Sequence, residues 1–224
     1  DKAINVNNAL RMYLPLLLAL TTSSPFYEGV DTGLHSYRTK IFESLPLAGL
    51  PDYLNDWNHF ETLTKNLIDA KVIKSVKDLW WEVRLHPGFG TVEVRICDVP
   101  TNFEEILALV ALVQALVVTV QDVDNYPDTH IQILESNKWQ AARYGLEGTF
   151  IDPLTLNKLS VQKAIENLCN LLEPTMVSLG SEKYIKVIEK ILIKGTGATL
   201  QRKLFKKSAS FESMIQSLKE QFYN

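Results

Sequence analysis

The chain has 224 residues, of which 46% are hydrophobic and 22% are charged, values typical of a globular protein of one domain. Its formal net charge is −3 and its pI is about 5.9, so it has no overall basic field that would recruit nucleic acid. Its two cysteines fit neither a disulfide framework nor a metal knuckle, which favours a reducing, cytoplasmic location.

The N-terminal third is predicted to hold two helices separated by a long polar loop. Residues 5–22 have helical apolar periodicity, and Pro15 within them predicts a kink or a late start. Residues 21–33 are typical of a loop, and residues 57–70 are predicted to be helical. The sequence starts at Asp1 with no signal peptide, and we expect it to be a piece of a longer protein.

Two short strands are predicted next, at residues 79–85 and 91–98, around a turn rich in proline and glycine. In the second strand, hydrophobic and polar residues alternate with a period of two, so they point to opposite faces of the sheet. The hydrophobic face carries Val92, Val94 and Ile96, and the polar face carries Thr91, Glu93, Arg95 and Cys97.

A long apolar helix is predicted to follow the strands. Thr101 and Glu104 have the spacing of a capping box, which places the helix start there, and the helix is expected to run to about Gln121. It is apolar nearly all round, so we expect it to be buried on most sides. The apolar run falls short of the roughly 20 residues that a membrane span needs, which favours a core helix.

The remaining sequence is predicted to be mostly helical. Residues 131–144 form a candidate helix that ends at Gly145, and residues 158–222 are amphipathic helix broken at Gly180 and at residues 195–198. Helix therefore clearly exceeds strand. The predicted fold class is α+β, with a partial antiparallel sheet packed against a majority of helices.

The polar face of the second strand is the main candidate for chemistry. Alternation with charges outward is common in half-buried strands, so a surface ion pair between Glu93 and Arg95 is one interpretation. The other is a site that holds Mg²⁺ and phosphate together, because Mg²⁺ prefers oxygen ligands and the planar guanidinium group binds phosphate. Arg84 and His86 lie just across the turn.

Three further polar groups are weaker candidates. Asp31, Arg38 and Lys40 are candidate ligands for an anionic substrate, although a polar surface loop is the commoner explanation. Arg143 near a helix end is a candidate ligand, or it complements the helix dipole. Two glycines precede a helix at residues 195–203, but the sequence there lacks the ending of a phosphate loop, which favours a plain turn.

Four stretches together resemble the C-terminal part of the type 2 glutamate–cysteine ligase family. They are, in chain order, "LLLALTTSSPFYEGVDTGLHSYRTKIFESLPLAGLP", "WWEVRLHPGFGTVEVRICDVP", "NKWQAARYGLEG" and "GTGATLQR". The resemblance covers nearly all of residues 1–224. It implies the C-terminal portion of one catalytic domain of the glutamine synthetase and guanidino kinase type, with the N-terminal portion absent.

The resemblance implies an ATP- and Mg²⁺-dependent carboxylate–amine ligase of glutathione biosynthesis. ATP would phosphorylate the γ-carboxylate of glutamate, and an amine such as cysteine would attack the acyl phosphate. Membrane and nucleic-acid partners are not expected. By the same resemblance, Glu93 is a catalytic metal ligand and Arg95 is a catalytic contact of the transferred phosphoryl group.

The resemblance also assigns binding roles around these two residues. Arg84, His86 and, more weakly, Arg143 are expected to bind the nucleotide cofactor. Arg38 and Thr91 are expected to bind the substrate. Asp98 is expected to orient the end of the strand.

One departure from the family bears on activity. The family carries metal-binding glutamates at Glu-x-Glu spacing and a His-x-His-x-Gly strand, and neither spacing occurs in these 224 residues. We therefore expect this chain not to ligate by itself, and we expect an exposed sheet edge that favours homo-oligomers. Two alternatives remain: a non-catalytic nucleotide- or partner-binding relic, and a guanidino-type phosphotransferase. The second needs a reactive cysteine in a loop, whereas Cys97 is predicted in a strand and Cys169 in a helix.

Overall fold

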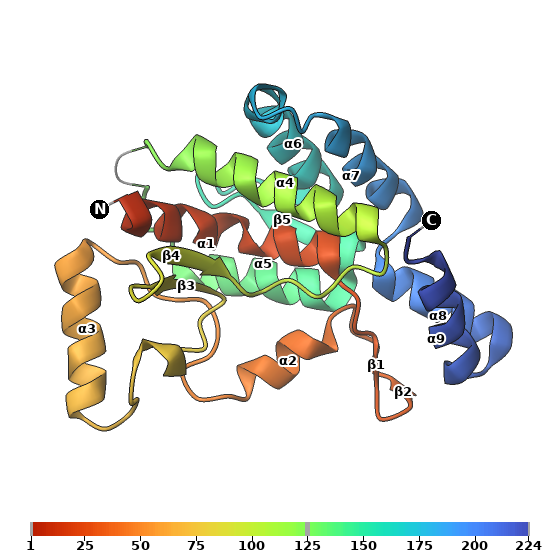
Figure 1. Cartoon of the computed structure of the whole chain (residues 1–224), viewed down its shortest axis with the longest axis horizontal. Helices are drawn as coiled ribbons and strands as arrows, with labels where there is room; N and C mark the ends of the chain where they lie inside the picture. Colours follow the sequence, from red (N-terminus) through yellow and green to blue (C-terminus); the bar gives the residue numbers. More distant parts are fainter. Residues whose placement is uncertain (1, 124–125, 224) are drawn as a thin grey trace.

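The computed structural model describes residues 2–123 and 126–223 of the chain (Figure 1). The helices are α1 (Lys2–Thr21), α2 (Tyr37–Glu43), α3 (Trp57–Asp69), α4 (Phe103–Val120), α5 (Ile131–Tyr144), α6 (Val161–Ser178), α7 (Lys183–Lys194), α8 (Gly197–Ser208) and α9 (Phe211–Gln221), with short 3₁₀ helices η1 (Val76–Asp78) and η2 (Gly145–Glu147). The strands are β1 (Phe26–Tyr27), β2 (Val30–Asp31), β3 (Val83–His86), β4 (Thr91–Val94), β5 (Thr149–Ile151) and β6 (Lys158–Ser160). Helices dominate, as the α+β prediction requires.

Helix α1 lies at the centre of the molecule, between α4 and α5 (Figure 1). Its buried side chains include Leu10, Leu14, Leu17 and Leu18, which join the hydrophobic core formed with α4, α5, α6 and α7. Burying apolar side chains all round one helix removes a large area from water and is the main source of stability here. The expected late start at Pro15 is wrong, because α1 begins at Lys2 and continues through the proline.

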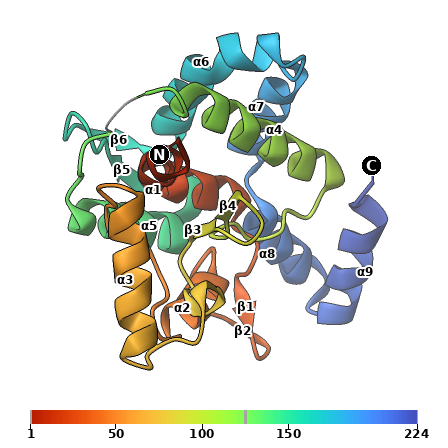
Figure 2. The same ribbon diagram turned by 60° about the vertical axis from the view of Figure 1, so that its left-hand side comes forward.

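A second, smaller hydrophobic cluster lies under α3. It joins the start of α1 to the β3–β4 hairpin through Ile4, Leu54, Phe60, Ile73, Leu79, Trp81 and Leu85. Helix α3 and the α8–α9 pair lie at opposite ends of the molecule (Figure 2). The hairpin is therefore held between the main core and this smaller cluster.

The strands form small separate sheets in the part of the chain that the structure describes. Each of β1–β2, β3–β4 and β5–β6 is a two-stranded antiparallel pair. The β3–β4 register places Arg84 opposite Glu93 and His86 opposite Thr91. The predicted strands 79–85 and 91–98 are shorter in the structure, although Arg95 N still donates to Glu82 O at 2.7 Å beyond the ladder.

Helix α4 differs from its prediction in two ways. Its N-cap is Asn102, whose side chain accepts from the amides of Glu104 and Glu105, and not Thr101 of the expected capping box. One face, including Leu112 and Leu116, is buried, whereas Phe103, Leu107, Val110 and Val118 are exposed, so the helix is not buried on most sides. Among the described residues, α4 is the one helix that is both long enough and apolar enough to cross a membrane. Core helices of globular proteins also meet these two criteria.

The predicted bounds of α5 and the break at Gly180 are confirmed, whereas residues 158–160 form strand β6, Gly197 already belongs to α8, and the break between α8 and α9 was not predicted. Helix α5 ends at Tyr144, and Gly145 follows with a φ of +56°, a conformation that favours glycine. Breaks occur at Gly180 and at residues 195–196, between α6, α7 and α8. The two-glycine segment is packed closely, since a side chain at Gly197 would meet Ser23 Oγ at 2.5 Å.

Candidate active site

The hairpin carries a cross-strand ion pair between Arg84 and Glu93. Arg84 Nη2 and Nε donate to Glu93 Oε2 at 2.7 and 3.1 Å. The remaining nitrogen, Nη1, donates to the carbonyls of Lys77 and Leu79 at 2.9 and 3.0 Å. Arg84 is buried and each of its guanidinium nitrogens has an internal acceptor. In this structure it fixes Glu93 and ties η1 to the hairpin.

Arg95 approaches the same carboxylate from the other side. Its Nη1 lies 3.6 Å from Glu93 Oε2, and its guanidinium group lies over the Trp80 ring, 5.1 Å from the centroid. Burial lowers the pKa of Arg95, the positive charges of Arg84 and Arg38 lower it further, and Glu93 opposes them. Two guanidinium groups thus pair with the Glu93 carboxylate, and the positive charge of Arg38 also acts on Arg95.

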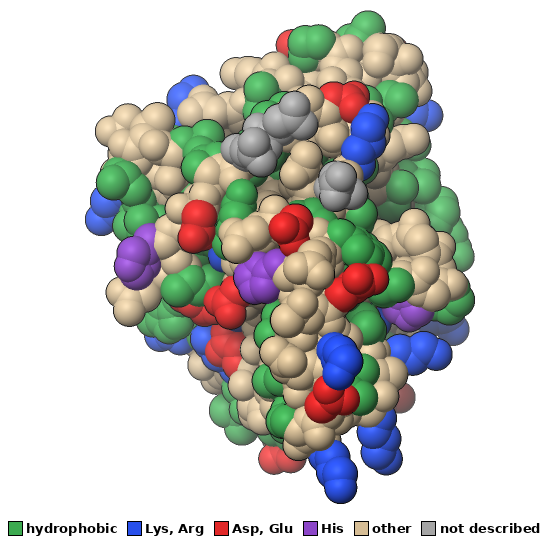
Figure 3. All heavy atoms as spheres, turned by 90° about the vertical axis from the view of Figure 1, so that its left-hand side faces the viewer, with side chains coloured by type: hydrophobic (Ala, Val, Ile, Leu, Met, Phe, Trp, Pro, Cys, Tyr) green, Lys and Arg blue, Asp and Glu red, His purple; other side chains and the backbone are tan. Residues whose placement is uncertain are grey.

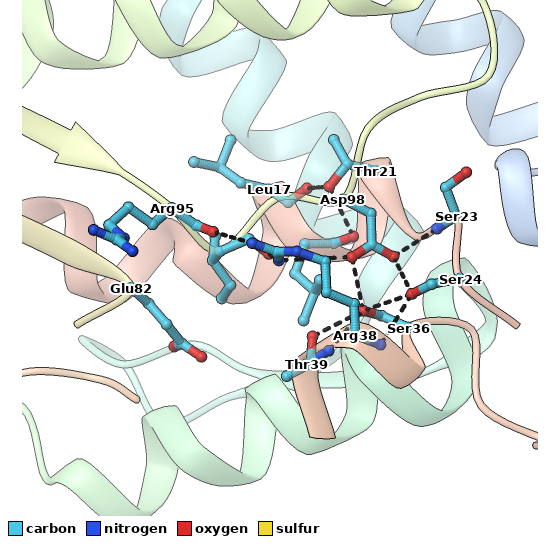
Figure 4. Close-up of polar contacts among 12 residues, drawn as sticks. Leu17, Thr21, Ser23, Ser24, Ser36, Arg38, Thr39, Glu82, Arg95 and Asp98 are labelled. Carbon is cyan, nitrogen blue, oxygen red and sulfur yellow. Dashed lines mark hydrogen bonds and ion pairs between the residues drawn. The ribbon is translucent and has the colours of Figure 1, made fainter. Parts of the chain in front are cut away.

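Arg38, the third of these residues, reaches the cluster from α2. Its Nη1 donates to Ile96 O at 3.1 Å and its Nη2 to Arg95 O at 3.0 Å (Figure 4). Its guanidinium group also lies 4.5 Å from the Phe42 ring centroid. The expected substrate contact Arg38 and the expected phosphoryl contact Arg95 are therefore neighbours. We call Arg38, Arg84, Glu93 and Arg95 the arginine cluster.

Asp98 holds the chain that leaves the hairpin. Its buried carboxylate accepts from Ser23 N at 2.8 Å, Ser24 Oγ at 2.8 Å and Ser36 Oγ at 3.0 Å (Figure 4). Arg38 Nη1 lies 3.7 Å from it. These contacts join the end of α1, the start of α2 and the strand end, so Asp98 positions Arg38 and the backbone of Arg95 as the orienting role requires.

His86 and Thr91 lie at the turn end of the hairpin. The His86 ring stacks on Phe89, with centroids 4.3 Å apart, and its Nδ1 is buried without a hydrogen-bond partner. Thr91, opposite His86 in the register, is exposed. Their roles toward nucleotide and substrate stay predictions.

Arg143 lies in a different polar group. At the end of α5 its Nη1 donates to Gly33 O at 2.5 Å, and a side chain at Gly33 would collide with it. Asp31 in the same loop forms a bidentate ion pair with Arg202 of α8, at 2.7 and 2.9 Å. Arg143 of α5 therefore contacts the loop that carries Asp31, and the predicted nucleotide contact of Arg143 stays untested.

A buried charged group behind the hairpin was not predicted. Lys138 Nζ lies 2.9 Å from Glu82, 3.1 Å from Glu43 and 3.8 Å from Glu135. Burial lowers the pKa of Lys138, but the three carboxylates outweigh it and raise the pKa. Burial raises the pKa of Glu82 despite Lys138. One sequence signal existed: Lys138 follows Leu134 by four residues and precedes Ala141 by three, which is the buried face of α5.

No metal centre is complete within the described residues 2–123 and 126–223, where no group of three or more potential ligand side chains comes together. Burial raises the pKa of the Cys97 thiol to about 12, which disfavours the reactive thiolate. The arginine cluster instead suits an anion, because it offers guanidinium donors next to the rings of Trp80 and Phe42.

Comparison with a solved structure gives the class of fold. The crystal structure of glutamate–cysteine ligase from Francisella tularensis, solved in complex with AMP, matches with a TM-score of 0.68 over 99% of this chain and 57% of that chain. Sequence identity is 13%, so the likeness shows the fold alone. The chain has the α+β architecture found in a glutamate–cysteine ligase.

Sequence comparison gives the family. The model of glutamate–cysteine ligase family 2 (GCS2) matches residues 1–221, and the chain belongs to this family. A Gloeobacter violaceus protein provisionally named glutamate–cysteine ligase 2 is 43% identical over 97% of this chain and 60% of its own length. A Solibacter usitatus protein of the same name is 36% identical over 99% of the chain and 58% of its own length. The chain thus spans about three-fifths of these relatives.

Proposed function

We propose that this chain is part of an ATP-dependent carboxylate–amine ligase that joins the γ-carboxylate of glutamate to an amine such as cysteine. The observation that carries the proposal is the arginine cluster, which joins the β3–β4 hairpin to α2 within the residues that the family model matches. The AMP in the Francisella tularensis structure supports an adenine nucleotide as co-substrate. A role in glutathione biosynthesis and a cytoplasmic location are parts of the same proposal.

The proposed reaction requires positive charge next to the transferring phosphoryl group. A γ-carboxylate oxygen attacks the terminal phosphorus of ATP, and ADP leaves. The amine nitrogen then attacks the acyl carbon, and inorganic phosphate leaves. Both reactants of the first step are negatively charged, so they repel each other strongly in a site that is partly shielded from water. A fixed guanidinium group reduces this repulsion and stabilises the charge that spreads over the transferring phosphoryl group.

Arg95 is the residue of the cluster best placed for this task. The guanidinium nitrogens of Arg84 already donate to Glu93 and to backbone carbonyls, and those of Arg38 donate to two backbone carbonyls. The charged contact of Arg95 is the looser 3.6 Å pair with Glu93. Its guanidinium group therefore has donors to offer a ligand, while Arg38 holds the Arg95 backbone and Arg84 holds Glu93.

Mg²⁺ does not fit the described residues as they stand. Glu93 is the carboxylate of the arginine cluster, and its Oε2 is already paired with Arg84. A hard cation of this kind needs several oxygen ligands, and no such set is complete in the part of the chain that the structure describes. We assign no step to the metal, and Glu93 as its ligand stays a prediction.

Activity of the chain by itself is the first test. ADP release that depends on both ATP and glutamate is measured for this chain and for a chain extended to the full span of its relatives. We expect turnover only by the longer protein. Clear turnover by the short chain would show that these residues suffice and would contradict the expected incompleteness.

Binding separates a ligase from a non-catalytic relic. We expect Mg²⁺-dependent ATP binding by calorimetry in the longer protein, together with turnover. Binding without any turnover, with glutamate and a set of amines present, would favour the relic. The guanidino-type phosphotransferase is opposed by the raised pKa of the Cys97 thiol, which keeps it protonated at neutral pH.

A further inference from the structure

Arg11 of α1 is a buried charge with no ion pair within 4.0 Å among the described residues. Its side chain is 2% exposed, and its Nε is buried with no hydrogen-bond partner. Burial lowers the pKa of Arg11, although Asp128 and Asp52 partly offset this effect. A buried charge that is only partly compensated is unfavourable, so an anion beside the guanidinium group would stabilise it.

A polar pocket of about 420 Å³ opens at this guanidinium group. It is lined by Arg11, Asp52, Tyr53, Asp128, Thr129, His130 and Ile131. The pocket shares none of these residues with the arginine cluster. On the face that shows the N-terminal end of α1, acidic side chains and histidine gather near the centre of the surface (Figure 3). Its volume lies in the range that small ligands occupy.

The walls of the pocket carry opposite charges. Arg11 lies within it, 5.9 Å from the Tyr53 ring centroid, and the exposed carboxylates of Asp52 and Asp128 also line it. The N-terminus of α5, which begins at Ile131, adds the positive end of a helix dipole, although the amides of Gln132 and Ile133 already donate to His130. A simple anion would meet two carboxylates, and a simple cation would meet the guanidinium group.

We propose that this pocket binds a free α-amino acid, with its carboxylate on Arg11 and the α5 N-terminus and its ammonium group on Asp52 and Asp128. Such a ligand carries both charges a short distance apart, which matches the two charged sides of the pocket. It also places a negative charge beside the buried guanidinium group. The inference goes beyond the ligase proposal and does not depend on it.

The test follows the Nε–H signal of Arg11 in a ¹H–¹⁵N spectrum of this chain, assigned by its loss in R11K. L-Alanine is titrated, with propionate and ethylammonium as ligands that each carry one of its two charges. We expect a saturable shift with L-alanine in the millimolar range and binding about tenfold weaker or more for each single-charge analogue. No saturable shift with L-alanine would overturn the proposal, and so would equal binding of propionate.

Substitutions at exposed residues provide a test that does not depend on whether a variant of buried Arg11 still folds. The double variant D52N/D128N changes two exposed carboxylates and is expected to weaken L-alanine binding about tenfold. D69N, an exposed aspartate of α3 paired with Lys65, is the matched control and is expected to bind as the parent does. R95A is expected to leave the titration unchanged, which separates this pocket from the arginine cluster. An unchanged affinity in D52N/D128N would overturn the ammonium contact.

Discussion

Glu93 Oε2 lies 2.7 Å from Arg84 Nη2 and 3.6 Å from Arg95 Nη1, so one carboxylate holds two guanidinium groups of the same hairpin. The tighter pair spans the two strands, where Arg84 and Glu93 are register partners. Glu93 is thereby fixed by a buried arginine, and it in turn limits where Arg95 can lie. The structural role of Glu93 can be measured in this chain alone.

The substitution Glu93→Gln is expected to destabilise the chain by about 1–2 kcal/mol, because buried Arg84 loses a charged acceptor. Urea unfolding of the chain measures this loss. Glu166→Gln is the matched control, since its ion pair with Lys163 is half exposed and is expected to contribute little. Equal stability of the two variants would show that the Arg84–Glu93 pair does not hold the hairpin.

Lys138→Met is expected to cost about 3–5 kcal/mol, because it leaves the buried Glu82 carboxylate unpaired. The loss also acquires a pH dependence. Without Lys138 the folded-state pKa of Glu82, already raised by burial, rises further above its unfolded value of 4.5. Stability is then fully present below pH 4.5 and is lost as pH rises through the folded pKa.

Urea unfolding of Lys138→Met at several pH values above this point tests the account, with the double variant Glu82→Gln, Lys138→Met as control. The double variant is expected to regain part of the stability and to lose the pH dependence contributed by Glu82. A single variant whose stability does not fall as pH rises would show that Glu82 is not held in the core as described.

Asp98→Asn is expected to destabilise the chain by about 2–3 kcal/mol, because three donors converge on the buried carboxylate and an amide offers them a poorer set of acceptors. The midpoint of urea unfolding reports the change. Asp122→Asn, whose exposed pair is with Lys2, is expected to have almost no effect. Similar midpoints for the two variants would remove Asp98 as the anchor of the strand end.

Neither cysteine is expected to react with a maleimide in the folded chain at neutral pH. Burial raises the pKa of Cys97 to about 12 and that of Cys169 to about 11, so the reactive thiolate is scarce. Mass spectrometry of native and urea-unfolded samples measures the labelling, which we expect only after unfolding. Rapid labelling of Cys97 in the folded chain would support the alternative function as a guanidino-type phosphotransferase.

Much of the local structure follows from the sequence because it depends on neighbours along the chain. Alternation at residues 91–96 predicts the strand beside its turn, and Gly145 marks the end of α5. The helix start at α4 was misplaced because two adjacent residues, Thr101 and Asn102, are both good N-caps, and only the fold decides between them.

Contacts between distant segments were harder to predict. Glu82 and Lys138 are far apart in sequence, and neither carries a local sign that the other will lie 2.9 Å away. Arg143 was grouped with the strand residues by resemblance, whereas the structure places it on Gly33. The arginine cluster itself required the fold, since Arg38 reaches it from α2 through contacts that Asp98 organises.

The central claim is that Arg95 stabilises the transferred phosphoryl group. The direct measurement is ATP- and glutamate-dependent ADP release by a full-length protein, made by joining this chain to the part of the Gloeobacter violaceus relative that it does not cover. Lys163→Ala, in an exposed ion pair of α6, is the control. We expect Arg95→Ala to lower kcat about a hundredfold or more with little change in the KM for ATP, and Lys163→Ala to leave both unchanged. A kcat for Arg95→Ala equal to that of the parent would contradict the account.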